Sequence, residues 1–501
     1  LGIENNTDVK LLRFDPPIAD YELMAAWGAY DPNLFGQYTY TNTNLPVAST
    51  FFPSQFEERV SEGEAGLNGL VPKLGWTYEI AYTGNGTSTN SLVQTLGKTY
   101  TNNLTASLAA PLLKGAFWGG AWTQVELTGI GTGIALEQFR LRLMDIVRSI
   151  EDGYWNVAAT RQELEVSNKS LETARALLSQ TKAQYEVGVV SRVEVVEAEA
   201  GVADREFRQI AARTFYRQAQ DELIDRVYGP RLTPTTTLEI EELDRPEDFV
   251  KFALDPEAST QRAMERRPEL EIAHDQVEQS EISLQFAKNQ RLPQLDLVGS
   301  YGTYGLAGND PSCPFQTDQV GDTCVTRSTP PVSFPLEQPA GIGQDYGDAD
   351  SFWWKGNKDR VWVGGALFSI PIPNRTGRAN VGISELELRR AKTNVVRVEQ
   401  DIVKEVRQAV RNLESALQGV EAAERFVAAS AEQLRAERIR LEHGESTPFD
   451  VLLREQDLTQ AESQRIAALR IYRGSVTALD RAQGTLLEDR GIVLEDALTL
   501  R

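Results

Sequence analysis

The residue types that most often carry out catalysis or bind transition metals are scarce in this chain. Among its 501 residues there are two histidines, His274 and His443, and two cysteines, Cys313 and Cys324. A His-based triad or a Cys/His metal site therefore has few candidates, and we find no Gly-rich phosphate loop and no nucleophile motif. The carboxylates between residues 194 and 199 have the spacing of a solvated helix face. We predict no enzyme, no metal site and no cofactor.

The two cysteines lie eleven positions apart in a stretch rich in Pro, Gly, Asp and Thr. This composition indicates a loop. In an oxidising compartment, two cysteines in one loop favour a disulfide. We therefore predict a bond between Cys313 and Cys324, with two free thiols as the alternative.

The net charge and the hydropathy exclude two further classes. The chain has 51 Lys plus Arg and 72 Asp plus Glu, so its formal charge is 51 − 72 = −21. This balance argues against a nucleic-acid partner, because phosphates require a basic surface. The sequence has no apolar run of about 18 residues, so it predicts no membrane-spanning helix. Length alone would predict several globular domains.

The sequence instead repeats itself with an offset of 256 positions. The identical segments are residues 145–147 with 401–403, residue 188 with 444, residues 210–212 with 466–468, and residues 216–217 with 472–473. One ungapped register over so long a stretch indicates a duplicated structural unit.

Each copy also has a seven-residue period. The large residues of the first copy are Ile150, Val157, Leu164, Leu171, Leu178 and Tyr185, and those of the second are Val406, Leu413, Val420, Val427, Leu434 and Leu441. Mostly small residues follow three positions later in both copies. Large residues at a and small residues at d predict long helices that pack closely on both sides, as in a cylinder of helices.

Gly, Ser, Thr and Pro interrupt each heptad pattern once, as in a tight turn between antiparallel helices. We predict a first helical hairpin over residues 121–226 with its tip near 187–191. A second hairpin is predicted over residues 377–484 with its tip near 444–448.

Both return helices are shorter than their outgoing partners, so each leaves part of a long helix uncovered. We predict that the helical stretch 255–290 provides the missing cover in the second half, stacked end to end with the return helix. A shorter N-terminal helix, near residues 16–30, would take this place in the first half.

Segments of a different kind precede each long helix. Apolar residues alternate with polar ones near residues 34–44 and 100–112 in the first copy, and near 294–305 and 360–371 in the second. These segments also contain aromatic residues near their ends. Such segments of about ten residues are typical of transmembrane β-strands. Four strands cannot close a barrel, so several protomers must share one. Residues 69–82 also alternate and predict an extra strand or a hairpin extension.

These patterns divide the chain into four parts: a first repeat (1–230), an equatorial linker (231–254), a second repeat (255–485) and a C-terminal tail (486–501). The predicted fold is an α+β membrane protein with an internal two-fold sequence repeat. A transmembrane β-barrel shared between protomers continues in a long antiparallel α-helical barrel.

On these features the chain resembles the TolC-type outer membrane efflux proteins of Gram-negative bacteria. The similarity covers nearly the whole chain and includes the strand-to-helix junctions at 110–113 and 370–373 and the tips at 185–191 and 442–452. It implies a homotrimer with four strands per protomer in a twelve-stranded barrel in outer membrane lipid, and a twelve-helix tunnel in the periplasm. It also implies a periplasmic adaptor (membrane fusion) protein and an inner-membrane pump, for efflux or type I secretion.

The resemblance further assigns roles to tip residues. Tyr185, Glu186 and Asp450 correspond to the family's periplasmic gate, and Glu194 is the repeat partner of Asp450. Three copies of Asp450 would form a carboxylate ring that binds a multivalent cation. For Glu194 a solvated helix-end carboxylate is the alternative.

Two positions depart from the family, which often has an arginine at Ser446 and a tyrosine at Leu441, so any latch here must use other partners. The resemblance also implies that both tips contact the adaptor. The contact residues would be Val187, Gly188, Val189, Val190, Ser191, Gly444, Glu445, Ser446, Thr447 and Pro448.

The alternative to an export duct is a soluble periplasmic coiled-coil or adaptor protein without a pore. The heptads fit that alternative, but the aromatic strands and the cysteine-containing loop do not. The sequence does not indicate the cargo.

Overall fold

The computed structural model describes residues 2–46, 55–91, 94, 96–229, 233, 238–241, 244, 247, 255–311, 313, 317–336, 342–351 and 359–499. The chain forms two compact units. A helical unit comprises residues 1–20, 130–278 and 389–501, and a sheet unit comprises residues 21–129 and 279–388. None of the described helices contains a stretch long and apolar enough to cross a membrane. Most of the predicted linker, 231–254, lies outside the described residues.

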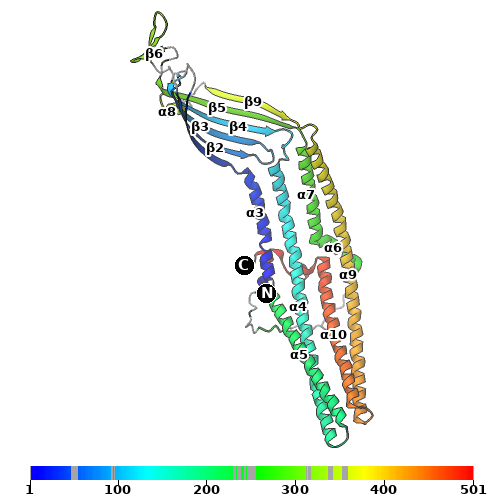
Figure 1. The fold of residues 1–501 in the computed structure, drawn as a ribbon. Helices are drawn as coiled ribbons and strands as arrows, with labels where there is room; N and C mark the ends of the chain where they lie inside the picture. The colour runs from blue at the N-terminus through cyan, green and yellow to red at the C-terminus, as the bar shows by residue number, and fades with distance from the viewer. Residues whose placement is uncertain are drawn as a thin grey trace. The chain divides into compact units, whose positions relative to one another are not determined.

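Figure 1 shows the elements in chain order. The helices are α1 (Gly2–Asn5), α2 (Thr7–Leu12), α3 (Asp15–Trp27), η1 (Gly28–Tyr30), α4 (Gly120–Glu186), α5 (Arg192–Tyr228), α6 (Pro256–Arg266), α7 (Pro268–Gln290), α8 (Tyr346–Ser351), α9 (Arg375–Glu442), α10 (Pro448–Gln483), α11 (Leu486–Asp489) and α12 (Leu494–Thr499). The strands are β1 (Asn33–Pro46), β2 (Gln55–Leu70), β3 (Thr77–Thr89), β4 (Leu96–Pro111), β5 (Gln294–Pro311), β6 (Thr317–Val320), β7 (Thr323–Thr326), β8 (Ser333–Pro335) and β9 (Arg360–Ser369).

The helical unit contains two antiparallel hairpins, α4–α5 and α9–α10 (Figure 1). Heptad positions form its core. The buried a residues include Val157, Leu171, Val406, Leu413, Val420 and Leu434, and the buried d residues include Ser167, Ala174, Thr181, Ala409, Ala416, Ala423 and Ser430. Small d residues let the helix backbones approach closely, and the large a residues fill the spaces beside them.

The stretch predicted as one helix, 255–290, is two helices. Helix α6 ends at Arg266, and α7 begins at Pro268. Arg267 between them has an extended backbone, with ψ of 123°. Because the proline ring clashes with an α-helical residue before it, the helix breaks here. Ala263 of α6 belongs to one core cluster with Leu469, Tyr472, Leu479 and Ala482 of α10.

The segment predicted as a C-terminal tail contains two packed helices instead. Leu486 and Leu487 of α11 and Ala497 of α12 are buried. They form one cluster whose other members are Val9 of α2 and Phe139, Leu143, Met144 and Val147 of α4. Burial of these apolar side chains explains why the segment is ordered.

The sheet unit is built on one antiparallel six-stranded sheet in the order β1-β2-β3-β4-β5-β9. The resemblance implied four strands, whereas this sheet has six, because β2 and β3 form an additional hairpin between β1 and β4. The alternating residues 69–82 are not a single strand. They include the end of β2, the turn at 71–76 and the start of β3.

The pairing register gives the sheet two chemically different faces. Residues that lie directly opposite one another on neighbouring strands share a face. The apolar face is defined by such pairs, among them Leu34 with Leu67, Leu67 with Ile80, and Tyr301 with Trp362. Its exposed large side chains are Leu34, Tyr38, Tyr40, Ile80, Leu108, Leu297, Tyr301, Trp362 and Phe368. The opposite, polar face carries mainly Thr, Ser, Asn, Gln and Glu, although β9 places Val361, Val363 and Leu367 there.

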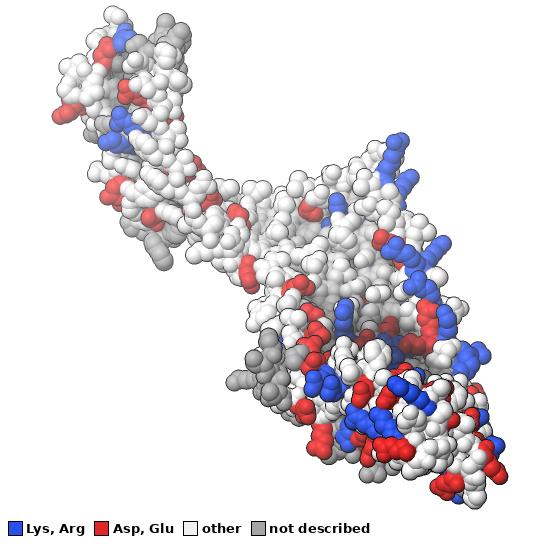
Figure 2. Space-filling view, turned by 60° about the horizontal axis from the view of Figure 1, so that its bottom comes forward, with Lys and Arg blue, Asp and Glu red and all other residues white. Residues whose placement is uncertain are grey.

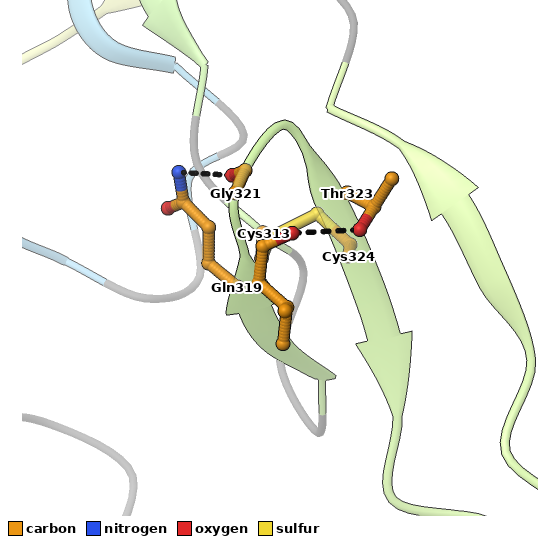
Figure 3. Close-up of a disulfide and its surroundings, with 6 residues drawn as sticks. Cys313, Gln319, Gly321, Thr323 and Cys324 are labelled. Atoms are coloured by element: carbon orange, nitrogen blue, oxygen red, sulfur yellow. Dashed lines mark hydrogen bonds between the residues drawn. A yellow bond between two sulfur atoms is a disulfide. The ribbon is translucent and has the colours of Figure 1, made fainter.

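A small sheet, β6-β7-β8, follows β5. Cys313 and Cys324 are joined by a disulfide, with Cα atoms 5.5 Å apart. Figure 3 shows this bond beside the β6–β7 turn, where Thr323 Oγ1 donates to the carbonyl of Val320 at 2.8 Å. The disulfide links the segment after β5 to β7.

Candidate functional site

The turn after α4 is closed by two backbone hydrogen bonds. Gly188 has φ of +80°, which glycine adopts without the steric cost of a Cβ atom. Its N–H donates to the carbonyl of Tyr185 at 2.9 Å, and Val189 N–H donates to Gln184 at 2.9 Å. This pair of bonds is a Schellman motif, which ends a helix sharply.

The turn after α9 has the same construction. Gly444 has φ of +76°, its N–H donates to Leu441 at 3.0 Å, and Glu445 N–H donates to Arg440 at 2.8 Å. Both glycines lie where the sequence analysis placed a turn, and they are separated by 444 − 188 = 256 positions. The two turns are therefore equivalent in geometry as well as in position.

Two of the predicted gate carboxylates cap the return helices. Glu194 Oε2 accepts a hydrogen bond from Ser191 N–H at 3.2 Å. Asp450 Oδ2 accepts from the N–H and the hydroxyl of Thr447, at 3.2 and 2.7 Å. Asp450 N–H in turn donates to Thr447 Oγ1 at 3.2 Å, which completes a capping box.

These hydrogen bonds affect the electrostatics of the second tip. The bonds from Thr447, first from its hydroxyl and then from its N–H, hold the pKa of Asp450 below its ordinary value. Asp450 is thus ionised at neutral pH. It lies at the N-terminus of α10, where the helix dipole favours an anion.

The other predicted gate residues belong to the end of α4. Tyr185 is 45% exposed, and Glu186 is exposed beside it. The structure thus places Tyr185, Glu186 and Glu194 around the first turn and Asp450 at the second.

The predicted adaptor-contact residues differ in character between the tips. The first tip presents apolar side chains, with Val187 75% and Val189 71% exposed. In the second tip Ser446 donates to Glu437 Oε1 at 2.5 Å, and Thr447 is used in the cap. Figure 2 shows acidic and basic side chains interspersed at the helical end that comes forward in that view.

Sequence analysis missed a buried charge cluster close to the tips. Arg205 of α5 is only 8% exposed, and its Nη2 donates to the carbonyl of Leu452 in α10 at 3.2 Å. Glu455 of α10 is also buried and pairs with Arg438 of α9 at 3.2 Å. Burial raises the pKa of Glu455, and the charges of Arg205 and Arg438 oppose this rise.

This cluster joins the two hairpins. A hollow of about 430 Å³ lies beside it, and its lining includes Thr173 and Leu177 of α4, Arg438 and Leu441 of α9, and Val451 and Glu455 of α10. Within the part of the chain that the structure describes, no group of three or more His, Cys, Asp or Glu side chains is placed to hold a metal ion. The two tips and the adjacent charge cluster can therefore contact another molecule through hydrogen bonds, charges and surface shape.

Long antiparallel helical hairpins with capped tips, together with an antiparallel sheet, define a class of channel proteins. The sequence matches the outer membrane efflux protein family over residues 63–225 and 260–485, more than half of the chain, and the chain belongs to this family. It is an export duct of the Gram-negative outer membrane that extends into the periplasm. Channels of this family generally work with an adaptor and an inner-membrane pump.

Solved structures show the same fold at low sequence identity. The Campylobacter jejuni CmeC outer membrane channel is 13% identical, with a TM-score of 0.68 over 100% of this chain and 88% of that chain. The open state of the Neisseria gonorrhoeae MtrE outer membrane channel is 15% identical, with a TM-score of 0.63 over 97% and 88%. The outer membrane protein VceC from Vibrio cholerae is 12% identical, with a TM-score of 0.63 over 96% and 94%. No match was found among curated protein sequences.

Proposed function

We propose that three copies of this chain share one transmembrane β-barrel and one helical barrel, and that both barrels form a continuous export duct. The observation that carries this proposal is the sheet. Among the described strands, β1 and β9 each pair with a single neighbour, so the sheet has two long unpaired edges. Unpaired strand edges and an exposed apolar face both favour aggregation in water. In a closed barrel the edges pair with the neighbouring copies, and in a membrane the apolar face contacts lipid.

The strand directions support closure between copies. Because all neighbouring strands are antiparallel and their number is even, β9 of one copy can pair antiparallel with β1 of the next. The apolar face then continues around the barrel toward lipid. The polar face lines the lumen.

The two halves of the chain would descend from one duplicated unit. The equal offset of the two glycine turns and of the two capping carboxylates supports this origin. Three copies of two hairpins would then give a tunnel of twelve helices, which is the arrangement that the resemblance implies.

The capped tips would form the periplasmic gate. In a trimer, Asp450 forms a ring of three carboxylates, and Tyr185, Glu186 and Glu194 lie on the neighbouring turns. Arg205 is a candidate latch, because it bonds α5 to the carbonyl of Leu452 one turn into α10. The apolar first tip, with Val187 and Val189, would be the main contact for a periplasmic adaptor.

The assembly is tested by its mass. Purified in detergent, the protein should have a protein mass of 3 × 55.6 = 166.8 kDa by light scattering. A protein mass near 55.6 kDa that persists in native membranes after chemical cross-linking would contradict the proposal.

The gate is tested in planar bilayers with La³⁺ as the blocking cation. Asp450→Asn should weaken the block by about tenfold, since it removes three negative charges from one ring. Glu194→Gln is the matched control at the equivalent cap, and its effect should be smaller. An unchanged block in Asp450→Asn would remove this residue from the constriction.

A further inference from the structure

The two halves of the chain differ in the number of strands between their short and long helices. In the second half, two strands of the six-stranded sheet, β5 and β9, lie between α7 and α9, and the separate sheet β6-β7-β8 is inserted between them. In the first half four strands, β1 to β4, lie between α3 and α4. The additional hairpin β2–β3 occupies the middle of the sheet, where both of its strands are paired on both sides.

This hairpin carries most of the acidic side chains of the polar face. The pairs Thr39 with Glu62, Gln37 with Glu64, and Asn68 with Glu79 place three carboxylates on that face. Glu58 of β2 and Asp296 of β5 share it. Among the strand residues of this sheet whose side chains the structure describes, no Lys or Arg lies on the polar face.

The polar face also provides most of the lining of a hollow in this sheet. A hollow of about 670 Å³ lies against the sheet near the β2–β3 turn. Ten of the fourteen strand residues in its lining belong to the polar face, among them Asn68, Glu79, Ser107 and Ser300, and four, Gly69, Tyr78, Leu108 and Gly299, belong to the apolar face. A hollow forms on the concave side of a curved sheet, and the concave side of a barrel is its lumen.

From this arrangement we infer that the β2–β3 hairpin sets both the width and the charge selectivity of the duct's β-barrel. The inference rests on the proposed trimer. With six strands per copy the barrel has 3 × 6 = 18 strands, and barrel diameter grows roughly linearly with strand number. Carboxylates without cationic neighbours lower the local potential, so the β-barrel admits bulky cationic or neutral cargo and slows anionic cargo.

The charge is tested with a reporter cysteine in the full-length protein in membranes. Both native cysteines are in the disulfide, so an introduced cysteine is the single free thiol. Ser107→Cys places it on the polar face opposite Glu79, and the adjacent Leu108→Cys places it on the apolar face as a matched control. Impermeant methanethiosulfonate reagents, one cationic and one anionic, are then added from outside.

The cationic reagent should modify Ser107→Cys about tenfold faster than the anionic one, as expected for several unscreened carboxylates. The triple variant Glu62→Gln/Glu64→Gln/Glu79→Gln should reduce this ratio to about two or less. Leu108→Cys should react slowly with both reagents. Equal rates for the two reagents at Ser107→Cys, or a ratio that the triple variant leaves unchanged, would overturn the charge assignment.

The width is tested by counting strands in a cryo-EM map of the detergent-extracted assembly. Eighteen strands support the inference, and a trimeric barrel of twelve strands, with β2–β3 outside the wall, contradicts it. If the proposed function itself were wrong, the result would be different. The protein would then be a monomer, and its map would show no closed transmembrane barrel. A trimer that conducts ions but fails these two tests would refute only the role of the hairpin.

Discussion

The two helical hairpins carry an ion pair at equivalent positions in two different environments. Lys182 pairs with Glu199 at 2.8 Å in the first hairpin, and Arg438 pairs with Glu455 at 3.2 Å in the second. Both offsets are 256, since 438 − 182 = 256 and 455 − 199 = 256. The side chain of Glu199 is 50% exposed, whereas that of Glu455 is 6% exposed.

The difference shows how a repeated sequence acquires unequal roles. An exposed pair contributes little to stability, because water and salt screen its charges. A buried pair has lost its hydration, so removal of one partner leaves an uncompensated charge. Glu455 also compensates Arg205 of the other hairpin, so the second pair connects the hairpins and the first does not.

The largest expected effect comes from removing the buried carboxylate. Glu455→Ala should destabilise the helical unit by about 3 to 5 kcal/mol, because the buried Arg205 loses the carboxylate that compensates its charge, whereas Arg438 is 49% exposed and remains hydrated. Glu199→Ala, at the equivalent position, should cost less than about 1 kcal/mol. Thermal unfolding of both variants in detergent measures the contrast.

Equal losses in the two variants would contradict the assigned difference between the hairpins. The double variant Arg205→Met/Glu455→Met serves as a further control. Because it replaces buried charges by apolar side chains of similar size, it should recover most of the stability lost in Glu455→Ala.

A second contrast concerns position 480 of α10 and its repeat partner, position 224 of α5. Ile224 is buried and apolar, whereas burial raises the pKa of Asp480 to about 6 despite the nearby Arg490. A carboxyl with a raised pKa resists ionisation in the folded state. It therefore destabilises the folded protein in a pH-dependent way. This destabilisation is absent at a pH well below the ordinary pKa and complete at a pH above the folded-state pKa.

Asp480→Asn removes this titration. The melting temperature of the variant relative to the wild type should therefore be higher at about pH 8 than at about pH 4. Calorimetry at the two pH values provides the measurement. A difference between variant and wild type that does not change with pH would show that folding does not raise the pKa of Asp480.

The smallest effects are expected at the two turns, where the hairpins are alike. Gly188 and Gly444 both have positive φ, and a Cβ atom at either position would meet no neighbour. Alanine should therefore cost about 1 to 2 kcal/mol at each site, from backbone conformation alone. Proteolysis rates at the tips should rise equally in Gly188→Ala and Gly444→Ala, and a large inequality would indicate that one turn has additional contacts.

The sequence predicted the features that depend on local patterns. Large and small residues at heptad spacing are enough to define long packed helices, as the burial of Val406, Leu413 and Ala416 shows. Gly188 and Gly444 mark the turns because few other residues adopt a positive φ. The break before Pro268 was also predictable, but the helical period around it concealed the signal.

Other features depend on neighbours that a sequence does not show. On the apolar face β2 offers Ser61, Gly63 and Ala65, which are poor strand signals, and it is defined by pairing along both edges. Gly129, Gly131 and Gly133 lower helix propensity, yet α4 is continuous through them. Arg205 has an ordinary place in the sequence, and only the packing of α5 on α10 buries it.

The central claim is that neighbouring copies join β1 to β9 in a shared barrel. The most direct test combines Thr39→Cys on β1 with a cysteine at each position from 361 to 367 of β9 in turn, followed by mild oxidation in native membranes. The account predicts covalent dimers and trimers at one β9 position, or at two positions two residues apart on the same face as Thr39, which would also fix the register. Monomer alone at every β9 position, in a protein that reaches the outer membrane, would contradict it.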